Sequence, residues 1–285
     1  MIASRDEVVR RIRGADLDRV EQAIGRLILD SIRISTEPYG AGPVGSSKLG
    51  GAPDLPVGEA WPALSGRPLA FIAQFRMDEA SRYDSERLLP REGMMWFFYD
   101  ANEQPWGEPA ERGGWRAIYR NVNMSALEEA ELPAALPEEC RFVPRRAQFS
   151  PESTLPAYES YDIQALELDE DEVEAYTELV GGLGGDDTGR HRLLGHPDVI
   201  QNEMETQCEQ ASRAPYYMYS EEGQRPAKLA ELAERARQWR LLLQIDSEDA
   251  AGMQWGDVGR LYYWGRADSL REMNLDDIWL VLQCY

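Results

Sequence analysis

Two stretches of the chain carry the same pattern of apolar and polar positions. Residues 69–99 and 239–264 each begin with an apolar run that closes on a glutamine, Gln74 or Gln244. A variable stretch follows, and then a glycine and a run of aromatic residues. Short runs of apolar, β-branched or aromatic residues bounded by Gly, Pro and Asp are typical of β-strands. The pattern therefore predicts two related sets of strands.

A third apolar run completes each set, at residues 115–122 and at residues 278–285. Each set then reads as a three-stranded meander with a variable insert, covering about residues 60–125 and 238–285. Short connections favour antiparallel pairing over a design that alternates strands and helices. The predicted fold class is α+β, with a mainly antiparallel sheet built from two related halves. Two further strand candidates are residues 142–149 and 158–168.

Helical signals lie at the N-terminus and between the two sets of strands. Residues 4–7 read Ser-Arg-Asp-Glu, a capping box that starts a first helix. Asp16 is placed to cap a second helix, whose apolar stripe is Leu17, Val20, Ile24, Leu27 and Ile28. We therefore expect a helical pair over residues 1–36, packed on a main domain over residues 37–285. Two later helices are predicted, one at 167–178 with seven acidic residues and no basic one, and one at 226–237.

Net charge narrows the range of partners. The chain has 51 acidic and 30 basic residues and a formal net charge of −21. Such a field opposes binding to nucleic acid or to an anionic membrane, and it attracts basic proteins. No apolar stretch approaches the ~20 residues of a membrane helix, and no signal peptide is visible. Three dispersed cysteines indicate a reduced, cytoplasmic protein, which we expect to be monomeric.

Familiar catalytic and metal-binding patterns are not found in the sequence. The only two histidines are His191 and His196, no G-x-S-x-G nucleophile turn occurs, and the cysteines lack the pairing of a zinc site. Residues 100–111 resemble a calcium loop, but Pro105 stands where that loop needs glycine. Residues 40–45 match a dinucleotide fingerprint, yet a Gly- and Pro-rich stretch follows instead of a helix. We therefore predict no cofactor, no metal and no assigned catalytic residue.

Polar and aromatic residues at the ends of the predicted strands form the candidate ligand site. They are Lys48, Trp61, Gln74, Gln201, Gln244, Asp246, Trp255 and Asp257. One interpretation is structural, because a buried amide must find hydrogen-bond partners and these side chains can satisfy backbone groups. The other is functional, because a few polar groups among aromatic residues are typical of a ligand pocket. Both interpretations place them where the two halves meet.

Several of these residues lie in motifs that resemble a known family. The motifs are residues 47–53 (Ser-Lys-Leu-Gly-Gly-Ala-Pro), 61–62 (Trp-Pro), 71–74 (Phe-Ile-Ala-Gln), 194–201 (Leu-Gly-His-Pro-Asp-Val-Ile-Gln), 243–247 (Leu-Gln-Ile-Asp-Ser), 255–257 (Trp-Gly-Asp) and 283–285 (Gln-Cys-Tyr). In this order they resemble the YwqG-like family of bacterial proteins, from about residue 40 onward. The resemblance implies a soluble, β-rich α+β protein and brings no reaction, cofactor or catalytic residue. Some relatives occur beside genes for secreted toxins and their immunity proteins.

Two functional hypotheses follow from different classes. The first is a non-enzymatic acidic binding protein with an immunity, toxin-neutralising or other protein-partner role. The second is a small-molecule-binding protein, or an enzyme of unrecognised chemistry, with its site between the two halves around Lys48, Gln74 and Asp257. Dependence on ionic strength separates them, because only the first should weaken sharply as salt screens the charges.

Overall fold

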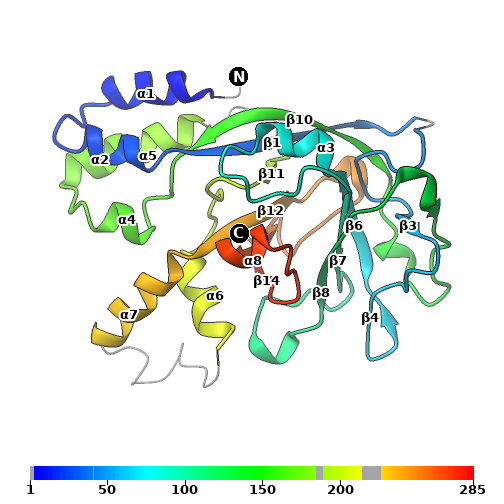
Figure 1. The fold of residues 1–285 in the computed structure, drawn as a ribbon. Coiled ribbons are helices and arrows are strands. Elements are labelled where there is room, and N and C mark those ends of the chain that lie inside the picture. The colour runs from blue at the N-terminus through cyan, green and yellow to red at the C-terminus, as the bar shows by residue number, and fades with distance from the viewer. Residues whose placement is uncertain (1–2, 41, 184–188, 214–225) are drawn as a thin grey trace.

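A single antiparallel sheet organises the chain, as the computed structural model shows for residues 3–40, 42–183, 189–213 and 226–285. Ten described strands form it, in the order β14-β13-β12-β11-β1-β10-β2-β6-β7-β8 (Figure 1). In that order the strands are Trp279–Gln283, Arg260–Arg266, Trp239–Asp246, His191–Leu193, Leu29–Pro38, Arg145–Thr154, Lys48–Leu49, Ala70–Arg76, Met94–Tyr99 and Trp115–Arg120. Every neighbouring pair is antiparallel. The predicted β-rich, antiparallel α+β class is confirmed.

The strand order is the same when read inward from either edge of the sheet. A three-stranded meander comes first, then a short strand, then one of the two long central strands β1 and β10. In one half Lys48 of β2 lies opposite Gln74 of β6, and in the other Arg192 of β11 lies opposite Gln244 of β12. Each meander also has an irregularity in its first pair of strands, between Phe71 and Ala73 in one and between Leu241 and Leu243 in the other.

The apolar runs are continuous because these strands are buried on both faces. Along β7, Met95, Phe97 and Tyr99 enter the main core, whereas Met94, Trp96 and Phe98 enter a smaller one. Two two-stranded sheets contribute to this covering: β3 (Asp54–Pro56) pairs with β9 (Leu127–Glu129), and β4 (Ala63–Leu64) pairs with β5 (Arg67–Pro68). A strand with two covered faces has no need of polar alternation.

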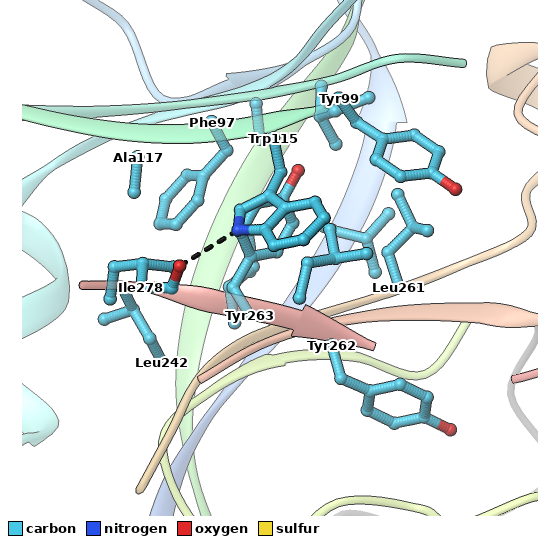
Figure 2. Close-up of a cluster of buried hydrophobic side chains, with 14 of the residues drawn as sticks. Phe97, Tyr99, Trp115, Ala117, Leu242, Leu261, Tyr262, Tyr263 and Ile278 are labelled. Atoms are coloured by element: carbon cyan, nitrogen blue, oxygen red, sulfur yellow. Dashed lines mark hydrogen bonds between the residues drawn. The ribbon is translucent and has the colours of Figure 1, made fainter. Parts of the chain in front are cut away.

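The two outer strands of the sheet approach each other. The indole Nε1–H of Trp115 in β8 donates to the Ile278 carbonyl at 2.9 Å, and its ring lies 5.4 Å from that of Trp279 in β14 (Figure 2). Among the described strands, β14 stands at the edge of the sheet and pairs with β13 alone. Gly107 covers its other side so closely that a Cβ would come within 2.2 Å of the Leu280 carbonyl. The sheet is thus nearly closed.

A second core lies under the helices at one end of β1 and β10 (Figure 1). The helices there are α1 (Arg5–Arg13), α2 (Glu21–Arg26), α4 (Tyr161–Gln164) and α5 (Glu170–Leu183). Ser4 caps α1 by accepting the Glu7 backbone N–H at 3.3 Å. The other helices are α3 (Met77–Ala80), α6 (Glu205–Ala211), α7 (Pro226–Ala236) and α8 (Ala267–Arg271), with 3-10 turns at Ser81–Tyr83, Pro109–Glu111, Met124–Ala126, Glu138–Cys140 and Asp249–Ala251.

Two sequence predictions differ from the structure in this region. The predicted strand at 158–168 is wrong, because Ser160 caps the short helix α4 there by accepting the Ile163 N–H. The second N-terminal helix is shorter than its apolar stripe suggested, since the chain turns into strand β1 at Leu29. Strand β1 contributes residues from both sides of the expected boundary at 36/37 to the central sheet.

Candidate functional site

Lys48 and Gln74, two of the predicted site residues, meet in a sealed cluster within the first half of the sheet. Lys48 Nζ lies 3.2 Å from the Asp54 carboxylate, and both side chains are 2% exposed. Gln74 accepts the backbone N–H of Asp54 at 2.7 Å and donates to its carboxylate at 2.6 Å. Trp61 lies apart from this cluster, half-buried, and donates its indole N–H to the Leu69 carbonyl. None of the larger pockets found among the described residues is lined by Lys48 or Gln74.

Gln244 and Asp246 belong to a separate cluster in the second half. Gln244 accepts the Asp198 N–H at 2.9 Å and donates to the Asp198 carboxylate at 2.9 Å. The Asp246 carboxylate accepts the Arg190 N–H at 2.9 Å and receives Arg260 Nε at 3.1 Å. Four strands separate this cluster from Gln74 along the sheet order, so the predicted residues form two clusters and not one site.

The remaining predicted residues are placed around the second cluster without facing one another. Trp255 is fully buried and donates its indole N–H to the Asp246 carbonyl at 3.2 Å. Gln201 is exposed and donates to the Cys284 carbonyl at 2.8 Å. Asp257 is also exposed, and its backbone carbonyl accepts the N–H of Tyr285 at 3.2 Å. In each of these three contacts a backbone carbonyl accepts the hydrogen bond, so the contacts stabilise the local backbone conformation.

Asp246 of the second cluster lines a cleft with a volume of about 870 Å³. We name it the arginine cleft. Four arginines line it, Arg33 from β1, Arg145 from β10, Arg190 from the segment before β11 and Arg260 from β13. The carboxylates in its wall are those of Asp246, Glu248 and Asp249, and Thr36, His191 and Tyr285 also line it. Four cations against three anions stand out in a chain with a net charge of −21.

Arg145 and Arg190 keep hydrogen-bonding capacity directed at this cleft. Arg145 forms an ion pair with Glu248 at 3.3 Å through Nε, and its side chain is 16% exposed. The side chain of Arg190 contacts Asp198 at 3.5 Å and is 31% exposed. A guanidinium has five N–H donors, so one carboxylate contact leaves most of them for another partner. Paired donors in this fork geometry match a carboxylate or a phosphate.

His191 and Glu248 form the fixed floor of the arginine cleft. The Asp246 backbone N–H donates to Nδ1 of His191 at 3.0 Å, so the ring proton lies on Nε2, which is 3.1 Å from the Glu248 carboxylate. Thr36 donates its hydroxyl to the same carboxylate at 2.5 Å. Burial alone would raise the pKa of Glu248, but the hydrogen bonds from His191 and Thr36 hold it below its ordinary value. His191 and Thr36 thus both donate to the Glu248 carboxylate and fix its position in the floor of the cleft.

A smaller pocket of about 290 Å³ adjoins the arginine cleft and shares Arg190, Arg260 and Tyr285 with it. Its charged floor is Arg192, whose guanidinium lies 2.7 Å from Asp198 and 3.3 Å from Glu152. The rest of its lining is mixed in polarity and includes Val180 and Leu183 as well as Glu159 and Thr177.

The described residues hold no group of three or more His, Cys, Asp or Glu side chains arranged to bind a metal ion. All three cysteines are free and buried. No helix in the described ranges is long and apolar enough to cross a membrane.

A family model describes most of the chain. It is a domain of unknown function, DUF1963, and it matches residues 47–284. The chain belongs to this family. The match includes both clusters and most of the lining of the arginine cleft, whereas Arg33 and Thr36 precede it. A search of the curated proteins finds no match.

The sequence did not identify the arginines of the cleft. Arg33, Arg145 and Arg190 lie in three distant segments, and 28 of the 30 basic residues of the chain are arginine, so none of them stands out. A usable signal was present for Asp198: residues 49–54 read Leu-Gly-Gly-Ala-Pro-Asp, and residues 193–198 read Leu-Leu-Gly-His-Pro-Asp. Comparing these two segments would have placed Asp54 and Asp198 beside the glutamines.

Proposed function

We propose that this DUF1963 protein binds a small anionic molecule bearing carboxylate or phosphate groups in the arginine cleft. The observation that carries the proposal is the gathering of Arg33, Arg145, Arg190 and Arg260 in one cleft of a strongly acidic chain. The negative field around the protein disfavours large polyanions such as nucleic acid, because they extend over its acidic surface. A small anion fits within the arginine cleft, where the guanidinium groups can donate hydrogen bonds to it. The role is that of a binding protein, since the cleft supplies recognition groups and no assigned nucleophile.

Titration calorimetry with two probes, citrate and pyrophosphate, tests this function. The double variant Arg145→Gln/Arg190→Gln removes the two donors that face the cleft and keeps the buried pairs of Arg33 and Arg192. We expect affinity at this cleft to fall about tenfold or more, because each hydrogen bond to a charged group contributes about 1.5 kcal/mol or more. The matched control is Arg271→Gln, which removes an exposed arginine whose ion pair in the described part of the chain is with Asp268 on α8. Equal affinity in the double variant and the control would rule out the proposal.

The alternative class, an acidic protein that engages a basic partner in an immunity or toxin-neutralising role, is supported by helix α5. Five acidic residues at its start and along it, Asp169, Glu170, Asp171, Glu174 and Glu178, are exposed. The described ion pair of this helix is instead made by Glu172 with Arg19. We propose this face as the second candidate. Binding of a polyarginine peptide should weaken in the variant Glu170→Gln/Asp171→Asn/Glu174→Gln and not in Glu128→Gln/Glu129→Gln/Glu131→Gln.

We also propose that the sheet consists of two related halves, larger than the repeats expected at 60–125 and 238–285. The support comes from equivalent contacts. Asp54 lies with Lys48 and Gln74 as Asp198 lies with Arg192 and Gln244. Trp96 donates its indole N–H to the Asp54 carbonyl at 2.8 Å, and Tyr262 donates its hydroxyl to the Asp198 carbonyl at 2.6 Å.

Backbone conformation supports the same relation. Gly50 and Gly51 have φ of 64° and 74°, and Leu194 and Gly195 have φ of 59° and 73°. A left-handed φ at a non-glycine residue such as Leu194 is costly, so the turn is maintained for what it positions.

Within the family, the motif resemblance supports a YwqG-like, bacterial assignment. The free, buried cysteines support a cytoplasmic location, and both statements are proposals.

A further inference from the structure

A second polar cleft, of about 450 Å³, lies on the other side of the central strand pair. We name it the serine cleft, after Ser46 and Ser47 in the segment leading to β2. Its other principal lining residues are Arg76, Arg82, Tyr83 and Arg146. The arginine cleft is lined by residues of β1 and β11 together with residues of β10, β12 and β13, and the serine cleft by residues of β10 and of the segment before β2. Counted from opposite edges of the sheet, β1 corresponds to β10 and β11 to β2.

The two clefts have matching floors. The Arg76 backbone N–H donates to Ser47 Oγ at 3.0 Å, just as the Asp246 N–H donates to His191 at 3.0 Å. Ser47 in turn donates to the Glu79 carboxylate at 2.8 Å, as His191 contacts that of Glu248 at 3.1 Å. The two hydrogen-bond chains therefore correspond. Each begins at a backbone N–H two residues after the strand glutamine, passes through one polar side chain (Ser47 or His191) and ends on a carboxylate that follows the strand (Glu79 or Glu248).

The arginines on the central strands also correspond. Arg33 of β1 lies opposite Arg192 of β11, and Arg146 of β10 lies opposite Lys48 of β2. Arg192 and Lys48 are the two residues whose charges are neutralised by Asp198 and Asp54. In each half, a buried cation that is paired with an aspartate (Arg192 or Lys48) thus lies opposite an arginine of the neighbouring strand that lines the cleft (Arg33 or Arg146).

Relative to its volume, the serine cleft has a larger excess of arginines over carboxylates in its lining than the arginine cleft. Three arginines line it and one carboxylate, that of Glu79. Arg82 donates Nε–H to the Asp78 carbonyl at 2.8 Å and, within the described part of the chain, has no carboxylate at ion-pair distance. Arg146 has a long contact of 3.8 Å with Glu37, and its side chain is 41% exposed. Arg82 and Arg146 therefore retain donors for a bound anion.

We propose that the serine cleft is a second anion-binding site, related to the arginine cleft and specific for small molecules that carry at least two phosphate or carboxylate charges. Arg82 and Arg146 reach the cleft from two different elements, the 3-10 turn after helix α3 and strand β10. A single charge engages one guanidinium, whereas a molecule with two charged groups engages both. The lining shares no residue with that of the arginine cleft, so each site can exist without the other.

Equilibrium dialysis with radiolabelled pyrophosphate, repeated with citrate, measures the stoichiometry directly. We expect two probe molecules per wild-type chain, one in Arg82→Gln/Arg146→Gln, one in Arg145→Gln/Arg190→Gln and none in the quadruple variant. A phosphate diester or acetate, which carries a single negative charge, should compete at least tenfold less well than these multiply charged probes. Thermal unfolding of each variant serves as the folding control, because Arg82 and Arg146 are surface side chains whose removal leaves the core intact.

The outcomes separate this inference from the proposed function. One bound probe that persists in Arg82→Gln/Arg146→Gln and is lost in Arg145→Gln/Arg190→Gln overturns the second site and keeps the first. One bound probe with the reverse dependence supports the serine cleft and overturns the proposed function. Absence of binding to wild-type protein by either probe overturns both.

Discussion

Trp115 in β8 and Ile278, the residue before β14, join the two edges of the sheet through an indole-to-carbonyl hydrogen bond of 2.9 Å. The Trp279 ring packs edge-on against Trp115, and its own indole N–H donates to the Gly107 carbonyl at 2.9 Å. Figure 2 shows Trp115 reaching from one group of strands to the other across the aromatic core. Because an exposed strand edge invites pairing with another chain, this contact protects β14 as well as stabilising the sheet.

Replacing Trp115 with phenylalanine should destabilise the protein by about 1–2 kcal/mol. The change leaves the Ile278 carbonyl buried without its donor, and it removes part of the ring contact with Trp279. Urea unfolding measures the effect. Trp106→Phe is the matched control, since Trp106 is 44% exposed and should change stability by less than about 0.5 kcal/mol. Equal stability of the two variants would show that the edge contact contributes nothing.

Removal of residues 278–285 should leave the protein insoluble. Four side chains of this segment, Trp279, Leu280, Val281 and Leu282, are at most 2% exposed, and without them β13 becomes an uncovered edge. Trp279→Ala alone should cost ~3 kcal/mol or more, because it empties a large core position. Deletion of Tyr285 only, which is 75% exposed, is the control. A soluble truncated protein with an unchanged melting temperature would contradict this prediction.

Lys48→Met should destabilise the fold by ~3 kcal/mol or more, as removal of one partner from a buried ion pair does. Asp54 is 2% exposed and would keep a charge among hydrogen bonds from Gln74 and Gly45. The double variant Lys48→Met/Asp54→Asn should recover part of the loss, because neither charge then remains. Chemical unfolding compares both with Arg10→Gln, an exposed pair expected to change stability by less than about 1 kcal/mol. A double variant as unstable as the single one would argue against charge as the cause.

The stability of the protein should fall in mild acid because of His196. Burial lowers its pKa to about 4, against about 6.5 in an unfolded chain, although the hydrogen bond to the Leu27 carbonyl acts in the opposite direction. Between these values only the unfolded state takes up the proton, so this contribution is complete above pH 6.5 and is lost as the pH falls toward 4. It amounts to about 2 kcal/mol between pH 7 and pH 5.

Urea unfolding at the two pH values checks the role of His196. The variant His196→Gln keeps a donor for the Leu27 carbonyl and removes the titration, so its stability should depend less on pH over this range. Glu205, whose pKa burial and the neighbouring Glu203 raise to about 8, is unchanged in both proteins and cancels in the comparison. Identical pH profiles for wild type and variant would contradict the prediction.

Local pattern was sufficient for the strands that are buried along their whole length. The apolar runs ending at Gln74 and Gln244 lie within β6 and β12, and the aromatic runs that follow form β7 and β13. Helix α7, at Pro226–Ala236, lies where its helical spacing predicted. These elements were predictable because the burial of their own side chains produces the pattern of apolar residues, whichever strand or helix they pack against.

The strands that hold the halves together could not be predicted in this way. Strand β1 carries Ser31, Arg33 and Ser35 between its apolar residues, and strands β2 and β11 span two and three residues. Their hydrogen bonds come from strands more than 100 residues away in several cases, as between Leu29 and Thr154. A stretch this short or this polar becomes a strand only when a partner supplies its backbone hydrogen bonds.

The same distinction applies to the candidate sites. Gln74 and Gln244 were recognisable in the sequence because an amide at the end of an apolar run must be satisfied by specific partners. The arginines of the two clefts were not, since their meaning depends on which segments meet: Arg33 with Arg190 on one side of the central pair, Arg82 with Arg146 on the other. The sequence by itself determined the buried strands and their repeated pattern. The tertiary structure alone decided where charge gathers, because a cleft forms between elements whose order in space, β11-β1-β10-β2, bears no relation to their order along the chain.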